Sequence, residues 1–296
     1  MTTDSPQMAL LKRHTHALID WASVVYERWH DELPVHPLVP HYFRSDANRM
    51  PVLLTLDSVS DAHMRLLCAN LEDAENRPFM QMLACLLRVG EETSHDSLVF
   101  HLTSMLMLDG PGRDGARRLL KYCQGGVFLH LLRILPPRRI RQLFGPVQTW
   151  SVPFQREWIT FTPPETTDLI PTYWAVDEKQ QQRIGRIGHI NTVLIRWRDQ
   201  TNRRWASIDD FHADAEKVDQ ILIFAEHRYQ LRDLEDRLAF AEHSMTYGEH
   251  FHEHPRIQQI MQAVQEKGWG YAEKSLVITE DDWKAIEAAQ GRPKTR

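Results

Sequence analysis

The chain has 296 residues, of which 42% are hydrophobic and 25% charged, and its formal net charge is −5. These shares are typical of globular domains and exclude a fibrous, low-complexity or intrinsically disordered protein. The length is enough for one large domain or two ordinary ones, and either would bury a sizeable core.

Cysteine usage and hydropathy bear on the compartment. The three cysteines lie far apart and form no CxxC pair, which predicts a reducing environment and no zinc framework: Cys68, Cys85 and Cys123. The N-terminal residues lack the basic, apolar and small-residue regions of a secretory signal. The longest apolar run, from Val127, contains His130 and Arg133 and is far shorter than the roughly 20 residues that cross a bilayer. We therefore expect a cytoplasmic protein that does not bind a membrane.

The first hundred residues predict alternating strands and helices. Apolar runs from His16 ("HALIDWA") and from Met50 ("MPVLLTLDS") are typical of strands, and Ser58 or Ser60 is placed to cap a helix after the second. A further helix is expected from Pro78, with these residues on one face: Met82, Leu83, Leu86 and Leu87. The stretch "HDSLVFHL" predicts another short helix.

Residues 104–123 predict a β-hairpin, because two apolar runs flank a turn rich in glycine and proline at 109–115. The turn has GxGxxG spacing, but Pro111 interrupts it and no acidic residue follows about 20 positions on, which disfavours a dinucleotide-binding loop. Two helices are then expected, "VFLHLLRIL" and "PPRRIRQLFG", with Gly145 ending the second. A short alternating strand is predicted at Trp158 to Phe161.

The remainder predicts helices. One follows Asp177, and in the next apolar residues recur at 4,3,4,3,4 spacing from Phe211 to Tyr229. A second series from Leu231 is out of phase, so a break is expected near Gln230, and Thr279 is placed to cap the last helix. We predict an α+β fold: an α/β lobe with a small, mostly antiparallel sheet (1–150), a proline-rich linker (151–176) and an all-helical lobe (177–296).

The charge is unevenly distributed. No Asp or Glu occurs between Ala116 and Arg156, a segment that contains Arg117, Arg118, Lys121, Arg133, Arg138, Arg139, Arg141 and Arg156, whereas the chain after Trp205 is rich in acids. The simpler interpretation is ordinary solvated charge on strand and helix faces. The alternative is a basic surface that docks an acidic partner.

The stretch "GEHFHEHP", residues 248–255, suggests a metal site, because it sets three histidines at alternate positions beside two glutamates. His243 lies upstream and could join His250, His252 and His254. The HExxH order and cysteine pairs of familiar zinc sites are missing, and the stretch lies between two predicted helices. We predict an exposed loop without a functional metal.

Other catalytic signatures are also missing from the sequence. It contains no GxSxG nucleophile elbow, phosphate-binding GxxxxGK[ST] loop or kinase set. Cys85 and Cys123 lie in apolar surroundings, where a thiol is more often a core residue than a nucleophile. We therefore expect no enzyme, no catalytic residue and no cofactor.

The stretch "LHLLRILPPRRIRQLFGPVQTW", residues 129–150, resembles the effector chaperones, or adaptors, of type VI secretion systems. The resemblance extends back to the strand at Gly115–Tyr122, to "LTSMLML" and to "HALIDWA", and forward to a variable helical region. It covers most of the chain, with its specific motifs in the first 150 residues. Two departures mark a divergent member: residues 124–127 replace the family's Asp-Pro-Arg-Val, and His16 and Trp21 replace a tyrosine and a glycine.

The resemblance implies a cytoplasmic adaptor that binds a toxic effector and helps load it onto the VgrG spike, with no nucleic-acid partner. We expect Arg138, Arg139 and Arg141 to contribute to partner binding. Trp150 is a further candidate for binding, although the core is the better expectation for any single aromatic residue. Four motif residues are expected to be structural, ending a helix and turning the chain: Leu143, Phe144, Gly145 and Pro146. The alternatives are a metal-dependent hydrolase using the four histidines, or a nucleic-acid-binding module using the basic segment 117–141.

Overall fold

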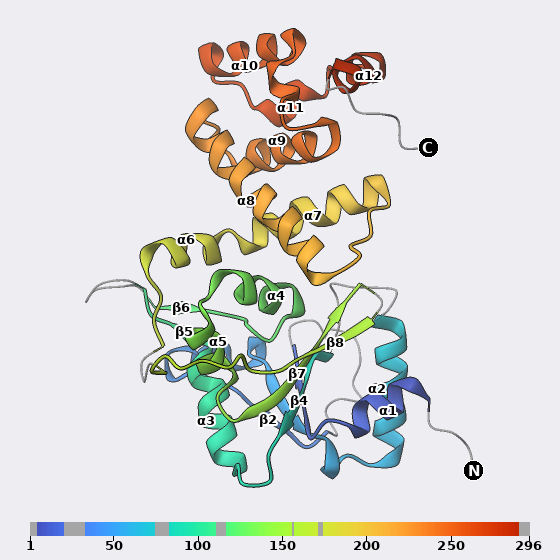
Figure 1. The fold of residues 1–296 in the computed structure, drawn as a ribbon, viewed down its shortest axis with the longest axis vertical. Helices are drawn as coiled ribbons and strands as arrows, with labels where there is room; N and C mark the ends of the chain where they lie inside the picture. Colours follow the sequence, from blue (N-terminus) through green and yellow to red (C-terminus); the bar gives the residue numbers. More distant parts are fainter. Residues whose placement is uncertain are drawn as a thin grey trace. The chain divides into compact units, whose positions relative to one another are not determined.

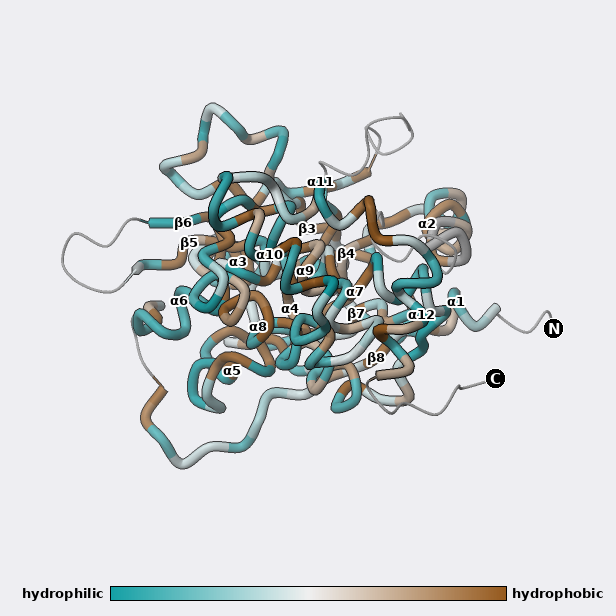
Figure 2. Tube along the Cα trace, turned by 90° about the horizontal axis from the view of Figure 1, so that it is seen from above, coloured by the Kyte–Doolittle hydropathy of each residue, from teal (hydrophilic) through white to brown (hydrophobic). Residues whose placement is uncertain are grey.

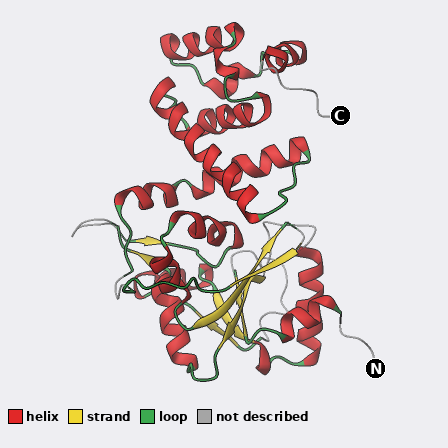
Figure 3. Ribbon diagram, in the orientation of Figure 1, coloured by secondary structure: helices red, strands yellow, loops and turns green. Residues whose placement is uncertain are grey.

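The structure is a computed structural model that describes residues 5–20, 33–74, 83–110, 117–155, 157–170 and 174–289. The chain divides into two compact units, Met1–Ile184 and Gly185–Arg296. The strands all lie in the first unit, and the second consists of helices and their connections (Figures 1 and 3). The predicted α+β class, with a sheet in the N-terminal half and helices in the C-terminal half, is confirmed.

The first unit is built on a six-stranded antiparallel sheet in the order β2-β3-β1-β4-β7-β8. Its strands are β1 (His16–Ile19), β2 (Val35–Pro37), β3 (Val52–Thr55), β4 (Leu83–Val89), β7 (Val147–Phe154) and β8 (Glu157–Phe161). A separate antiparallel pair consists of β5 (Met107–Leu108) and β6 (Arg118–Leu119). This pair confirms the predicted hairpin, whose connection at 111–116 lies outside the described residues.

Helices surround this sheet. They are α1 (Pro6–Lys12), the 3-10 helices η3 (His41–Arg49) and η4 (Leu56–Ser58), α2 (Asp61–Ala74), α3 (His95–Met105), α4 (Gly125–Ile134) and α5 (Pro137–Phe144). α1 and α2 lie side by side (Figure 1). The Ser60 hydroxyl accepts a hydrogen bond from the backbone of His63 at 3.3 Å, which confirms Ser60 as a cap of α2.

Both faces of the sheet are buried. Ala17 and Ile19 of β1 join the core that contains residues of α1 and α2. Leu18, between them in sequence, is also fully buried, and neighbouring side chains of a strand point to opposite faces. On the face of Leu87 lies its cross-strand partner Trp150, which stacks on Phe128 of α4. Each central strand therefore has apolar side chains on both sides.

This double burial explains the one element assigned to the wrong class. The helix predicted from Pro78 is wrong, because residues 83–89 form the strand β4. A strand buried on both faces is a continuous apolar run without period-two alternation, and such a run is indistinguishable from a buried helix by pattern alone. Pro78 and Met82 lie outside the described residues.

Strand β7 continues across residue 150, where the sequence placed a lobe boundary. It pairs with β4 through Val147–Ser151 and with β8 through Trp150–Phe154. Pro153 lies beyond the pairing with β4, so its missing N–H removes no bond to that strand. The chain divides into its two compact units between Ile184 and Gly185, after the whole proline-rich segment.

The second unit is helical. After α6 (Glu178–Gly185), which ends at its border, come α7 (Ile187–Thr201), α8 (Ile208–Tyr229), α9 (Leu234–Tyr247), the 3-10 helix η5 (Phe251–Glu253), α10 (Pro255–Lys267), α11 (Tyr271–Ser275) and α12 (Glu280–Ala289). The break predicted near Gln230 is confirmed, since that residue has φ of 56° and ends α8. Among the described residues, no helix has the length and apolar character needed to cross a membrane.

Candidate functional site

Helix α5 presents the basic residues that the sequence singled out. Pro137 stands in its first turn, where a proline removes no helical hydrogen bond, and the helix ends at Gly145. Its residues include both strongly hydrophilic and hydrophobic types, visible as teal and brown along α5 in Figure 2. Leu143 and Phe144 are fully buried, whereas Arg138 is exposed. The helix thus holds one face in the core and carries arginines outside it.

The three arginines differ in their surroundings. Arg139 donates to the Oε1 atom of Gln142 at 2.8 Å. The pKa of its guanidinium is lowered, mainly because the group is partly buried and also because the positive charge of Arg138 is nearby. Arg138 is exposed and Arg141 half-buried, and neither has a hydrogen-bonding or ion-pair partner for its side chain among the described residues. The segment 116–156 also contains no carboxylate. The outer face of α5 therefore carries uncompensated positive charge.

The end of α5 is built by the motif residues. Gly145 has φ of 53°, a conformation that glycine adopts without strain, and its N–H donates to the carbonyl of Arg141 at 3.1 Å. The ring of His101 occupies the space where a Cβ atom of residue 145 would stand, and its Nε2 hydrogen bonds to the Leu143 carbonyl at 3.0 Å. Leu143, Phe144 and Gly145 thus have the structural roles that the sequence predicted, and Pro146 leads into β7.

Trp150 is not a surface residue. Its side chain is 0% exposed, and it contacts Tyr122, Phe128 and Phe144 at ring-centroid distances of 5.0–5.8 Å. The expected contribution of Trp150 to partner binding is therefore corrected: the residue belongs to the core, because strand β7 points it at α4 and α5.

Other basic side chains of the segment are neutralised within the unit. Arg117 pairs with Asp109 at 2.8 Å and lies over the ring of Tyr42. Lys121 lies 3.6 Å from the carboxylate of Asp20. A nucleic-acid surface depends on many free cations that meet phosphates, so these pairings weaken the reading of 117–141 as such a module. Arg138 and Arg141 of α5 have no such pairing among the described residues.

Gln124 and Gly125, where the sequence departs from the family pattern, have structural roles. Gln124 donates through Nε2 to Asp20 Oδ2 at 2.5 Å, which links this turn to the end of β1. Gly125 begins α4, and a Cβ atom there would stand 3.2 Å from the Pro153 carbonyl oxygen. Trp21, which also differs from the adaptor motif, lies outside the described residues.

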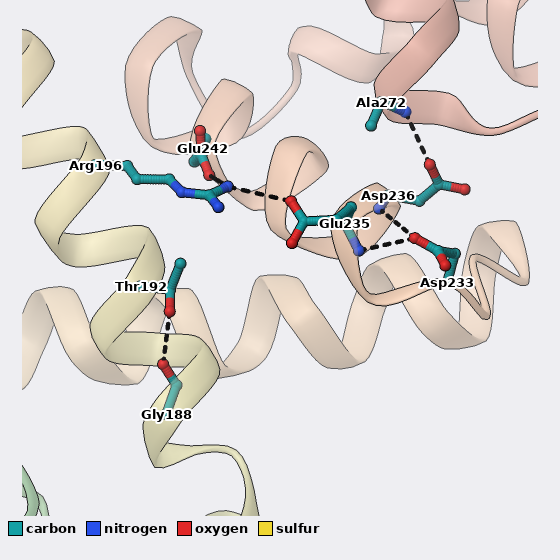
Figure 4. Close-up of polar contacts among 8 residues, drawn as sticks. All are labelled: Gly188, Thr192, Arg196, Asp233, Glu235, Asp236, Glu242 and Ala272. Carbon is teal, nitrogen blue, oxygen red and sulfur yellow. Dashed lines mark hydrogen bonds and ion pairs between the residues drawn. The ribbon is translucent and has the colours of Figure 1, made fainter. Parts of the chain in front are cut away.

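Several charged side chains of the helical unit form ion pairs or hydrogen bonds within it (Figure 4). Arg196 of α7 donates to Glu242 at 2.8 Å and to Glu235 at 3.4 Å, both on α9. Burial raises the pKa of Glu242, although the hydrogen bond from Arg196 opposes that shift. Asp236 of α9 is 8% exposed and accepts from the backbone of Ala272 at 2.9 Å, which ties α9 to α11. These contacts connect α7 and α11 to α9.

The four histidines proposed as metal ligands do not form one site. His243 is half-buried, its Nδ1 lies 2.8 Å from the Tyr271 hydroxyl, and its burial lowers its pKa to about 4. His254 caps α10, accepting from the backbone of Arg256 at 3.3 Å. The structure instead brings together His250, His252 and Glu253, whose ligand atoms all lie within 4.8 Å of one another. Sequence reading noted the adjacent glutamates but did not assign Glu253 to the group.

The buried cysteines do not have the properties of nucleophiles. Burial raises the pKa of the Cys123 thiol to about 12, and it also raises the pKa of Cys85 well above its usual value. Because the thiolate is the reactive form, both groups are inert at neutral pH. Cys68 is buried as well.

Comparisons with models of protein families, with curated proteins and with solved structures found no match. The resemblance to secretion adaptors therefore stays a prediction from sequence motifs.

Proposed function

We propose that the protein is a cytoplasmic adaptor that binds a toxic effector and promotes its loading onto the VgrG spike of a type VI secretion system. The proposal starts from the motif resemblance, whose specific motifs run from "HALIDWA" to "LFGPVQTW" and which extends forward to a variable helical region. A role of this kind needs binding surfaces and no catalytic groups.

The observation that carries the proposal is the charged face of α5. The adaptor-like motif residues Leu143, Phe144 and Gly145 form the end of α5, and the same helix carries Arg138 and Arg141. Unpaired guanidinium groups on a rigid helix are suited to carboxylates of a protein partner, because arginine binds them in a fixed two-pronged geometry. In this proposal α5 contacts one partner and exposed acids of the helical unit contact the other.

The inert thiols and the dispersed histidines fit a binding protein better than the rival hydrolase. The ion pairs of Arg117 and Lys121 likewise fit a protein-binding adaptor better than a nucleic-acid-binding module, which needs free cations. No particular observation favours the nucleic-acid module or a hydrolase that uses all four histidines.

The direct test is affinity purification of the tagged, full-length chain from lysate of its native host at moderate salt, with mass spectrometry of the bound proteins. The proposal predicts recovery of a VgrG protein together with one large toxin. Recovery of neither, from a lysate in which both are expressed, would reject it.

A further inference from the structure

The connection between α9 and α10 has a defined conformation. Its centre is the 3-10 helix η5, and Phe251 within it is fully buried, 5.0 Å from the ring of Phe240. At its end the side chain of His254 caps α10. These two attachments hold the intervening backbone, so the positions of the neighbouring side chains are set by the fold.

His252 is the most constrained of these side chains. Its Nδ1 lies 2.8 Å from the Tyr229 hydroxyl, and its ring packs against Phe224 at 5.1 Å and Phe240 at 6.0 Å. With Nδ1 engaged by the tyrosine, Nε2 is the nitrogen left for another ligand. A hydrogen bond to the second ring nitrogen is the usual way in which proteins orient a metal-binding histidine.

His250 and Glu253 complete the group from the solvent side. Their side chains are 65% and 63% exposed, and Nδ1 of His250 lies 3.3 Å from Oε1 of Glu253. Ligand atoms around a tetrahedral Zn²⁺ lie roughly 3.4 Å apart when the bonds are about 2.0–2.2 Å. The distance between Nδ1 of His250 and Oε1 of Glu253 already matches this separation. Ligand atoms of all three residues lie within 4.8 Å of one another, and rotation of the two exposed side chains can bring them closer.

We propose that His250, His252 and Glu253 bind a divalent transition metal of the Zn²⁺ type, with Tyr229 orienting His252. Two imidazole nitrogens and one carboxylate oxygen are donors that suit zinc, cobalt and nickel better than magnesium or calcium. Three protein ligands leave a fourth tetrahedral position for water or for a side chain of another molecule. This inference does not depend on the adaptor function.

The test is calorimetric titration of ZnCl₂ into the full-length chain, purified without a histidine tag. One equivalent of zinc is expected to bind. Glu253→Gln and His252→Ala should each weaken binding at least tenfold, and Tyr229→Phe should weaken it by about tenfold through loss of the orienting hydroxyl. His227→Ala is the matched control, since His227 is an exposed histidine of the same unit outside the group, and it should bind zinc as the wild type does.

Glu253→Gln changes an exposed side chain without changing its shape, so its result does not depend on whether the His252 variant folds. Titration with CoCl₂ adds a second readout, because tetrahedral Co²⁺ with nitrogen and oxygen ligands has a visible absorption that the same variants should abolish. Absence of binding to the wild type, or binding that these variants leave unchanged, would overturn the proposal.

Discussion

Asp20 shows how one buried charge holds separate parts of the first unit together. It follows β1, is 4% exposed, and contacts both Gln124 and Lys121, about a hundred residues further along the chain. We predict that Asp20→Ala lowers the free energy of unfolding by about 1–3 kcal/mol, because it leaves a half-buried ammonium and an amide without their acceptor. Urea unfolding followed by circular dichroism measures the change.

The control is Asp168→Ala, since that side chain is exposed and makes no contact with the core. Its effect should remain within about 0.5 kcal/mol. Equal destabilisation by both variants would contradict the structural role given to Asp20.

His243 should make stability depend on pH. Burial lowers its pKa from 6.5 to about 4, so the folded state binds a proton more weakly than the unfolded state. The stabilising contribution is therefore complete above pH 6.5 and is lost as the pH falls from 6.5 towards 4. A shift of this size corresponds to about 3 kcal/mol.

The measurement compares the free energy of unfolding at pH 7.5 and pH 4.5 in the wild type and in His243→Gln. The wild type should lose about 2–3 kcal/mol more than the variant over this interval, whatever their difference at pH 7.5. The same pH dependence in both proteins would show that His243 does not titrate in this way.

At the scale of elements, the end of α5 depends on one glycine. Gly145→Ala should destabilise the protein by about 1–3 kcal/mol, because the residue has positive φ and the His101 ring fills the space beside it. Gly188→Ala is the matched substitution: it lies in α7 with nothing within 4 Å of the added methyl group, and it should stabilise by about 0.5–1 kcal/mol. Thermal unfolding distinguishes the two, and a shift of the same sign in both would contradict the account.

The charged face of α5 is tested by reversing its charge. Arg138→Glu combined with Arg141→Glu should reduce recovery of the bound partner at least tenfold, because the new carboxylates repel the acids that the arginines are proposed to meet. The control is Arg44→Glu combined with Arg49→Glu, two exposed arginines of the same unit that lie outside the acid-free segment. Unchanged recovery with the α5 variant at low salt would remove α5 from the interface.

Element prediction from the sequence succeeded where local signals act alone. Ser60 and Thr279, both predicted as caps, accept hydrogen bonds from the backbone of His63 and Asp282. The spacing of Phe211, Ala215 and Val218 follows one buried helix face. β4 was misread because its side chains are buried on both faces, a fact fixed by α2 and β7 rather than by the strand itself. The sequence did not predict β7, because its place in the sheet depends on the pairing with β4, which is distant in sequence.

The candidate site shows the same limit. The sequence predicted the structural role of Leu143 and Phe144 because a helix end has a local signature. It favoured the core for Trp150 only as the general expectation for an aromatic residue and kept it as a binding candidate, since its burial depends on Phe128 of another element. Nor could it separate His243 from His252, because their surroundings are set by Tyr271 and Tyr229, distant in sequence.

At the scale of the whole molecule, the two compact units differ in which of their charged side chains have partners. Acids of the helical unit such as Glu242 and Asp236 are bound by Arg196 and by the backbone of Ala272. The first unit leaves Arg138 and Arg141 without partners among the described residues. An adaptor must bind two proteins at once, and units of different charge character suit that requirement.

The central claim concerns loading, so the most direct measurement is the amount of effector that purifies with VgrG from the native host. It is made in cells with and without this chain, once the bound effector has been identified. We predict that the effector is recovered with VgrG only when the chain is present, and that restoring the wild type, but not the Arg138→Glu/Arg141→Glu variant, restores recovery. Equal recovery of the effector in cells that lack the chain would contradict the adaptor function.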